Sequence, residues 1–118
     1  MLPEDEQSFG LSAATLAALR SVLAYHPHVE RAIVFGSRAK GTHRAASDID
    51  LTLIGEALTA SELLAIEGEI DDLLLPYQVD LSLHAHIEDA ALRAHIARVG
   101  RPLFESRVPG APVRRTDT

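Results

Sequence analysis

Hydrophobic residues recur at every third or fourth position in three stretches of the chain, and this spacing predicts amphipathic helices. The first helix is expected over residues 13–26. Ser12 stands directly before it as an N-cap residue, and Pro27 follows as a residue that ends helices. The residues that share its apolar face are Leu16, Leu19 and Leu23.

Two further helices are predicted in the second half of the chain. One begins behind a capping Thr59 or Ser61, and Pro76 lies just beyond its end. Its apolar residues are Leu63, Ile66, Ile70 and Leu73. The other covers about residues 88–99 and ends at Gly100 as a C-cap. Its apolar residues are Leu92, Ile96 and Val99.

Three short runs between these helices predict strands. Residues 29–35 are rich in β-branched and apolar side chains and end at a glycine, whereas residues 48–54 and 77–84 alternate apolar and polar side chains. In the second run Ile49, Leu51 and Leu53 point one way, and Asp48, Asp50 and Thr52 point the other. In the third run Val79, Leu81 and Leu83 face the core, and Asp80, Ser82 and His84 face away.

A brief helical turn is expected at residues 37–41, after the first strand. The complete order is then α-β-α-β-α-β-α. This order predicts an α/β fold in which helices pack on a small sheet.

Composition restricts the class of protein. The 118 residues are enough for one domain, expected over residues 1–106 with a loose start at 1–10 and a flexible basic tail at 107–118. The absence of cysteine excludes disulfides, thiolate metal sites and a cysteine nucleophile. An acidic start and the lack of a long apolar run argue against a signal peptide or a membrane span, so we expect a cytoplasmic protein. A net charge of −6 argues against broad nucleic-acid binding.

The stretch "VFGSRAKGTHRAASDIDL" contains the candidate chemistry. Asp48 and Asp50 lie on one face of a strand, roughly 6.5–7 Å apart along it. Two such carboxylates can hold one metal ion, or a pair of ions about 4 Å apart. Oxygen-only ligands suit Mg²⁺ or Mn²⁺. The alternative for these two residues is an ordinary solvated strand face.

The glycine and serine that follow the first predicted strand suggest a phosphate site. Gly36 lets the backbone approach a ligand closely, and Ser37 opens a turn whose N–H groups and hydroxyl can hold a phosphate. Arg38 and Lys40 are nearby cations, although solvated surface charges are an equal alternative. Asp80 can join Asp48 and Asp50 only if their strands are neighbours; otherwise it is a surface residue.

These motifs resemble a known signature. Gly36-Ser37, ten residues and then Asp48-Ile49-Asp50 is similar to the signature of the nucleotidyltransferase superfamily related to DNA polymerase beta, and "VDL" around Asp80 resembles its third-carboxylate strand. The short length, "GSRAKG", "SDIDL" and "IARVGRPLFE" resemble the minimal nucleotidyltransferases, which are antitoxin partners of HEPN-domain ribonuclease toxins. The resemblance covers roughly residues 12–105 and implies a small mixed sheet flanked by helices.

The resemblance also implies residue roles. Asp48 and Asp50 would bind two Mg²⁺ ions, and Asp80 would bind the catalytic ion and help activate the attacking hydroxyl. Gly36 and Ser37 would hold the triphosphate of ATP, with Arg38 assisting. Relatives of this kind transfer AMP from ATP to a tyrosine of the cognate HEPN toxin, release pyrophosphate and so silence the ribonuclease.

Other interpretations remain open. The acceptor could be a small molecule, although the chain lacks the added domain with which larger relatives hold one. The protein could also neutralise a toxin by binding alone, but a binding protein has no need to keep three like charges together. His84 and His86 could bind a transition metal, but no further ligand is evident. The remaining histidines, including His95, are interpreted as surface or packing residues.

Overall fold

A computed structural model of the chain describes residues 9–106. Of the loose start predicted at 1–10, residues 1–8 lie outside these described residues, as does the flexible tail predicted at 107–118. The prediction was wrong for Phe9, which is buried in the core. The elements, in chain order, are α2 (Ala13–Ala24), β1 (Arg31–Phe35), α3 (Ser37–Lys40), β2 (Ile49–Ile54), α4 (Ala60–Asp71), β3 (Val79–Leu83), the 3₁₀ turn η1 (His84–His86), α5 (Ala90–Val99) and β4 (Arg101–Glu105).

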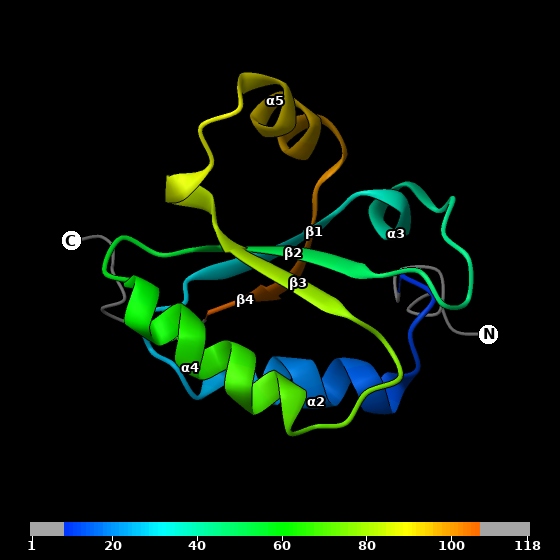
Figure 1. The fold of residues 1–118 in the computed structure, drawn as a ribbon, viewed down its shortest axis with the longest axis horizontal. Coiled ribbons are helices and arrows are strands. Elements are labelled where there is room, and N and C mark those ends of the chain that lie inside the picture. The colour runs from blue at the N-terminus through cyan, green and yellow to red at the C-terminus, as the bar shows by residue number, and fades with distance from the viewer. Residues whose placement is uncertain (1–8, 107–118) are drawn as a thin grey trace.

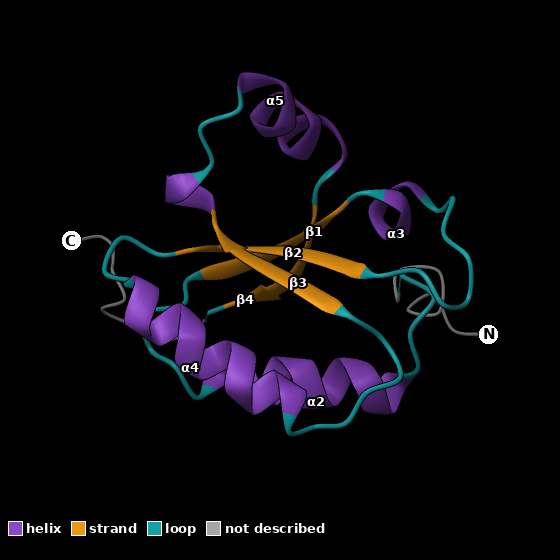
Figure 2. Cartoon of the chain, viewed as in Figure 1, coloured by secondary structure: helices purple, strands orange, loops and turns teal. Residues whose placement is uncertain are grey.

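The strands form one mixed sheet in the order β3-β2-β1-β4. β1 runs antiparallel to β2 and β4, and β2 runs parallel to β3. Helices α2 and α4 lie side by side under one face, whereas α5 lies over the other and α3 stands at the end of β1 (Figures 1 and 2). The predicted α/β fold with a small mixed sheet flanked by helices is therefore confirmed.

The main core fills the space between the sheet and helices α2 and α4. Each large aliphatic side chain buried there stabilises the fold by roughly 1.5–3 kcal/mol. The predicted inward faces of α2 and of β2 are confirmed, and in α4 the residues Ile66 and Ile70 are buried. The fully buried members of this cluster include Leu19, Leu23, Ile49, Leu51, Leu53 and Ile66.

Side-chain caps set where the helices begin. Ser12 caps α2 as predicted, because its hydroxyl accepts from the N–H of Thr15 at 3.1 Å. At α4 the cap is Thr59, which forms a reciprocal capping box with Glu62. Asp89 caps α5, so this helix begins at Ala90, slightly later than the predicted residue 88. Each such cap typically contributes about 1 kcal/mol.

The fourth strand, β4, was absent from the predicted element order. Pro102 within this run argues against a strand in the sheet interior, but β4 pairs with β1 alone and forms an edge, where proline is tolerated. Gly100 ends α5 as predicted, in an extended rather than left-handed conformation. A β-carbon on Gly100 would collide with the carbonyl of Ile96 and the side chain of Ile33, so glycine permits the direct passage from α5 into β4.

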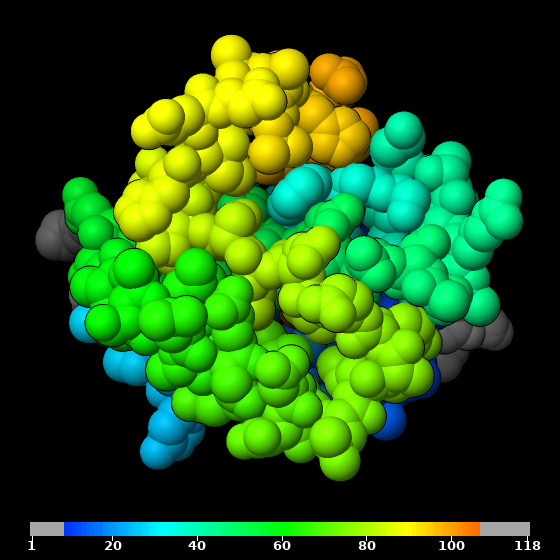
Figure 3. Space-filling view, viewed as in Figure 1, coloured from blue at the N-terminus to red at the C-terminus, as the bar shows by residue number. Residues whose placement is uncertain are grey.

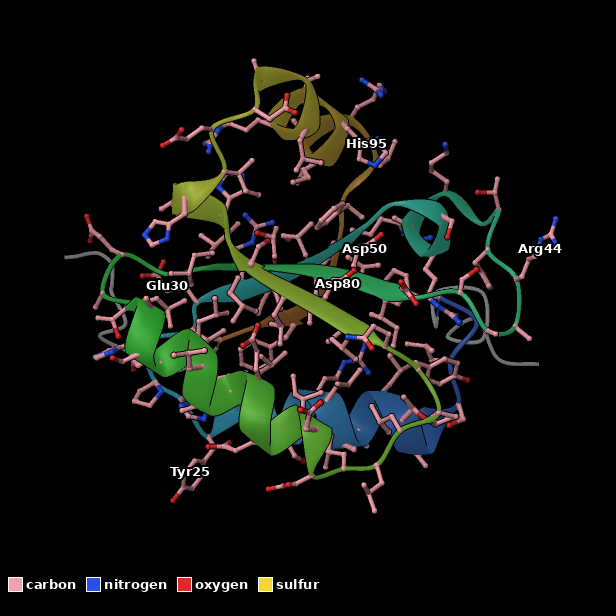
Figure 4. The ribbon with its side chains drawn as sticks, in the orientation of Figure 1. Tyr25, Glu30, Arg44, Asp50, Asp80 and His95 are labelled. Atoms are coloured by element: carbon pink, nitrogen blue, oxygen red, sulfur yellow. The ribbon has the colours of Figure 1, made fainter. Side chains whose placement is uncertain are left out.

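The face of β2 that carries Asp50 and Thr52 is not an open solvated face. Thr52 is 0% exposed, and its hydroxyl accepts from Ser82 Oγ at 3.0 Å. Helix α5 contacts β1 and the turn η1 contacts β2 on this side of the molecule. Thr52 is thus enclosed, whereas Asp50, near the start of β2, is only partly buried. Figure 4 shows Asp50 on the side of the sheet that faces α5. None of the helices in residues 9–106 is long and apolar enough to cross a bilayer.

Candidate active site

Two adjacent strands, β2 and β3, carry the predicted carboxylates to one place. In the parallel pairing of β2 with β3, Asp50 lies opposite Asp80, and on its other side Asp50 lies opposite Phe35 of β1. Figure 4 shows Asp50 and Asp80 close together on the side of the sheet that faces His95. Asp48 directly precedes β2, two residues before Asp50. The condition for Asp80 to join the site, that its strand neighbours that of Asp50, is therefore met.

The carboxylates influence one another electrostatically. The pKa of Asp50 is raised above its ordinary value, first by burial and then by the negative charges of Asp80 and Asp48, while His95 acts in the opposite direction. The ionised form of Asp50 is thus disfavoured by partial burial and by two neighbouring like charges. Such an arrangement is unfavourable by itself and is relieved by a cation.

Gly36 connects the end of β1 to α3 and lies against Asp50. Its φ of 74° is in the left-handed region that favours glycine, and a β-carbon there would collide with an Asp50 carboxylate oxygen. Ser37 begins the short helix α3, which Gly41 closes in the left-handed conformation. The predicted phosphate-binding pair Gly36-Ser37 therefore borders the carboxylates. The ten residues that separate this pair from Asp48 in the sequence do not by themselves require such proximity.

Arg38 does not face this site, which differs from its predicted role as a phosphate ligand. The side chain is 1% exposed, and its guanidinium lies over the Tyr77 ring at 4.9 Å from the ring centre. Its N–H groups donate to backbone oxygens at 2.7–3.5 Å. The acceptors belong to Phe9, Arg44, Ala45 and Ser47. We therefore leave Arg38 out of the proposed nucleotide site; it holds the loop that leads to Asp48.

Ser47 supports the same loop. Its hydroxyl accepts from the N–H of Arg44 at 2.7 Å, and its own N–H donates to the Arg44 carbonyl at 3.0 Å. These two bonds turn the loop just before Asp48. Arg38 and Ser47 together fix the backbone from which Asp48 enters the site.

His95 is the residue at this site that the sequence interpretation missed. Its Nε2 accepts from the N–H of Gly36 at 3.2 Å, and its ring meets the Phe35 ring edge to face with centres 6.2 Å apart. A signal for it was present: His95 shares the helical spacing of Leu92, Ile96 and Val99, so it belongs to the inward face of α5. The residues that this face contacts depend on where α5 packs against the sheet, which the helical spacing does not specify.

The donor set suits a hard divalent cation. Asp48, Asp50 and Asp80 offer only carboxylate oxygens, which Mg²⁺ and Mn²⁺ prefer, and a bound cation would offset the repulsion that raises the pKa of Asp50. Within residues 9–106, no three side chains of histidine, cysteine, aspartate or glutamate are already gathered as a metal site. The arrangement fits a site in which substrate phosphates complete the coordination, as is usual for Mg²⁺.

Comparison with protein families decides the family. The model of the family described as polymerase beta, nucleotidyltransferase matches residues 18–107, which include every element from β1 to β4. The chain belongs to this nucleotidyltransferase family. Its sheet and its glycine-serine turn are thus those of a nucleotidyltransferase domain, in agreement with the resemblance noted in the sequence.

Several solved structures share this fold. A chain of a toxin–antitoxin complex with AMP-PNP has 20% identity and a TM-score of 0.61, covering 82% of this chain and 76% of its own. A tri-AMPylated Shewanella oneidensis HEPN toxin in complex with MNT antitoxin gives 17% identity and a TM-score of 0.59, covering 80% and 72%. The complex MntA-HepT gives 16% and 0.59, covering 81% and 74%. No match is found among curated proteins.

Proposed function

We propose that this nucleotidyltransferase is an antitoxin that transfers AMP from ATP to a tyrosine hydroxyl of a HEPN-domain ribonuclease toxin and thereby neutralises it. The observation that carries the proposal is the meeting of Asp50 and Asp80 on neighbouring strands, beside Gly36, where any β-carbon would collide with an Asp50 oxygen. Asp48 lies at the entrance of the same strand. In metal-dependent phosphoryl transfer the protein mainly positions the reacting groups and neutralises their charge. These carboxylates would serve this purpose by holding the metal ions.

Each residue has a role in the proposed reaction. Asp48, Asp50 and Asp80 would hold one or two Mg²⁺ ions, which when bound neutralise the triphosphate and polarise the reacting phosphorus. Gly36 and Ser37 would hold the triphosphate through backbone N–H groups and the serine hydroxyl. The tyrosine oxygen forms a bond to the α-phosphorus, the bond from this phosphorus to the leaving pyrophosphate breaks, and Asp80 accepts the tyrosine proton.

The choice of a protein acceptor is supported by the structures with the same fold. One of them contains a HEPN toxin that carries AMP groups together with an MNT antitoxin, and another is a toxin–antitoxin complex with an ATP analogue. We extend these properties to this chain as part of the proposal. The predicted cytoplasmic location belongs to the proposal as well, because ATP, the proposed AMP donor, is available there.

The test is to express the protein together with its HEPN partner and to measure the intact mass of the partner. With wild type the partner should gain whole AMP units in the presence of ATP and Mg²⁺. With Asp48→Asn it should gain none, because one of three metal-binding carboxylates is lost. The matched control is Asp71→Asn, an exposed aspartate at the end of α4, which should transfer AMP as wild type does.

The result would also separate the alternative functions. If the partner stays unmodified, yet still forms a tight complex and is still neutralised, the proposal fails and the protein is an antitoxin that acts through binding alone. If AMP is found on a small molecule and the partner is unmodified, the acceptor is a small molecule, and the proposed transfer of AMP from ATP still stands.

A further inference from the structure

The N–H of Gly36 is engaged by a side chain from a distant part of the sequence. The acceptor is Nε2 of His95, which lies 59 residues later and reaches Gly36 from α5. Figure 3 shows α5, in yellow to orange, lying directly against the cyan segment that follows β1. This amide belongs to the turn that the proposed function assigns to the triphosphate.

We propose that His95 occupies, at the Gly36 amide, the place of a phosphate oxygen, and that the triphosphate of ATP displaces the His95 ring when it binds. The inference rests on the proposed function, since it concerns the same nucleotide site. It assigns His95 as a positioning residue that orients the Gly36 N–H in the free protein and competes with the nucleotide for it.

The hydrogen-bond geometry favours such an exchange. An N–H group makes one strong hydrogen bond, so Nε2 and a phosphate oxygen cannot both accept well from Gly36. The present bond, at 3.2 Å, is at the long end of the usual range for such bonds. A phosphate oxygen is a charged acceptor, and charge-assisted bonds are roughly twice as strong as neutral ones. The phosphate is therefore the stronger competitor.

The surroundings of His95 allow its ring to leave. The side chain is only partly buried, and its ring touches Phe35 through an edge-to-face contact rather than being enclosed in the core. The buried residue of α5 is its neighbour Ile96, which anchors the helix independently of His95. A change of the His95 side-chain rotamer can thus free the Gly36 N–H while α5 stays in place.

The turn at Gly36 is less suited to move than the His95 ring. The Gly36 carbonyl accepts from the N–H of Lys40 at 3.1 Å, and the space beside Gly36 is narrow, since a β-carbon there would collide with an Asp50 oxygen. Movement of the partly buried His95 ring leaves both of these features unchanged, so we assign the exchange to the ring.

The first measurement is the affinity for AMP-PNP with Mg²⁺ by calorimetry. His95→Ala removes the competing acceptor and leaves room for the phosphate, and alanine suits the helix interior. This variant should bind AMP-PNP about 2- to 10-fold more tightly than wild type, the range expected from one net hydrogen bond. His95→Gln, which keeps an acceptor, should stay within about 2-fold of wild type. The matched control is His86→Ala in η1, an exposed histidine, and it should not change the affinity. Unchanged or weaker binding by His95→Ala would overturn the inference.

The second measurement observes the bond itself in the wild-type protein. The through-bond ¹⁵N–¹⁵N coupling between Gly36 N and His95 Nε2 should be seen by NMR in the free protein and should disappear at saturating AMP-PNP with Mg²⁺. A coupling that persists in the nucleotide complex overturns the role of His95 and leaves the proposed function standing. If wild type does not bind AMP-PNP at all, the proposed function fails and the inference fails with it.

Discussion

The two faces of the sheet differ in what they contain and in what they contribute to stability. On the face toward α2 and α4, aliphatic side chains such as Leu51 and Ile66 are fully buried against one another. On the opposite face, at the end near α3, Asp50 lies beside Asp80 and against a left-handed Gly36. The first face stabilises the fold by removing apolar surface from water, and the second holds like charges together against their repulsion.

This contrast shows how the molecule separates folding from chemistry. A site that gathers negative charge is intrinsically unfavourable, and the opposite face of the same strands provides the favourable free energy that maintains it. Substitutions on the core face should therefore lower stability, whereas substitutions among the carboxylates should lower activity without lowering stability. Three predictions test this separation.

The largest effect is expected from Leu51→Ala. Leu51 is 0% exposed in the central strand β2, so truncation should lower the free energy of unfolding by about 2–5 kcal/mol. Chemical denaturation would measure the loss. The control is Leu64→Ala in α4, because Leu64 is 68% exposed and its truncation should change stability by no more than about 0.5 kcal/mol. Similar losses for both variants would contradict the assignment of the core to the α2–α4 face.

A smaller effect is expected from Arg38→Met, which tests the buried residue that holds the loop before Asp48. Removing the guanidinium leaves the buried carbonyl of Phe9 and the partly buried carbonyls of Ala45 and Ser47 without these donors, so the free energy of unfolding should fall by about 1–3 kcal/mol. Amide hydrogen exchange at residues 42–48 should become faster, since Arg38 holds this loop. The control is Lys40→Met, an exposed cation of the same short helix.

The Arg38 experiment also distinguishes its two suggested roles. If Arg38 bound a phosphate, as the sequence interpretation predicted, Arg38→Met would weaken nucleotide binding and leave stability and loop exchange unchanged. That outcome would return Arg38 to the nucleotide site.

The smallest effect, of opposite sign, is expected from Asp50→Asn. The pKa of Asp50 is raised in the folded state. The contribution of Asp50 to stability is therefore fully present below the pKa of the unfolded state, and it is lost as the pH rises through the pKa of the folded state. At neutral pH ionised Asp50 is therefore destabilising. Its replacement by asparagine should raise stability by less than about 1 kcal/mol, because solvent screens a carboxylate that is partly exposed.

Thermal unfolding as a function of pH would measure the effect of Asp50→Asn. The gain in Tm over wild type should be present at neutral pH and should vanish near about pH 3, where aspartates become protonated. A Tm below that of wild type at neutral pH would show that Asp50 stabilises the fold, and the proposed division between the two faces would fail. The exposed aspartate variant Asp71→Asn should show no such pH-dependent gain.

Sequence patterns were sufficient where a feature depends on neighbours in the chain. The alternation in residues 48–54 assigned Leu51 to the core and Asp50 to the opposite face, and the helical spacing identified the buried face of α2. Patterns failed where the partner is distant. Arg38 was interpreted from its proximity to Gly36 and Ser37, although its partners are loop carbonyls and Tyr77. Strand β4 was absent from the prediction; its run contains Pro102, which a sheet tolerates at an edge, and its place at the edge follows only from its pairing with β1.

By itself, the sequence determined the helices, the strands β1 to β3, their inward faces and the family signature, because these depend on spacings of two to about ten residues within one segment. The tertiary structure alone decided that Asp80 lies opposite Asp50, that Arg38 is buried beneath the loop before Asp48, and that His95 reaches the Gly36 amide. Each of these facts depends on which strands pair and where a helix packs. Pairing and packing follow from burial of apolar surface over the whole chain, which no local pattern contains.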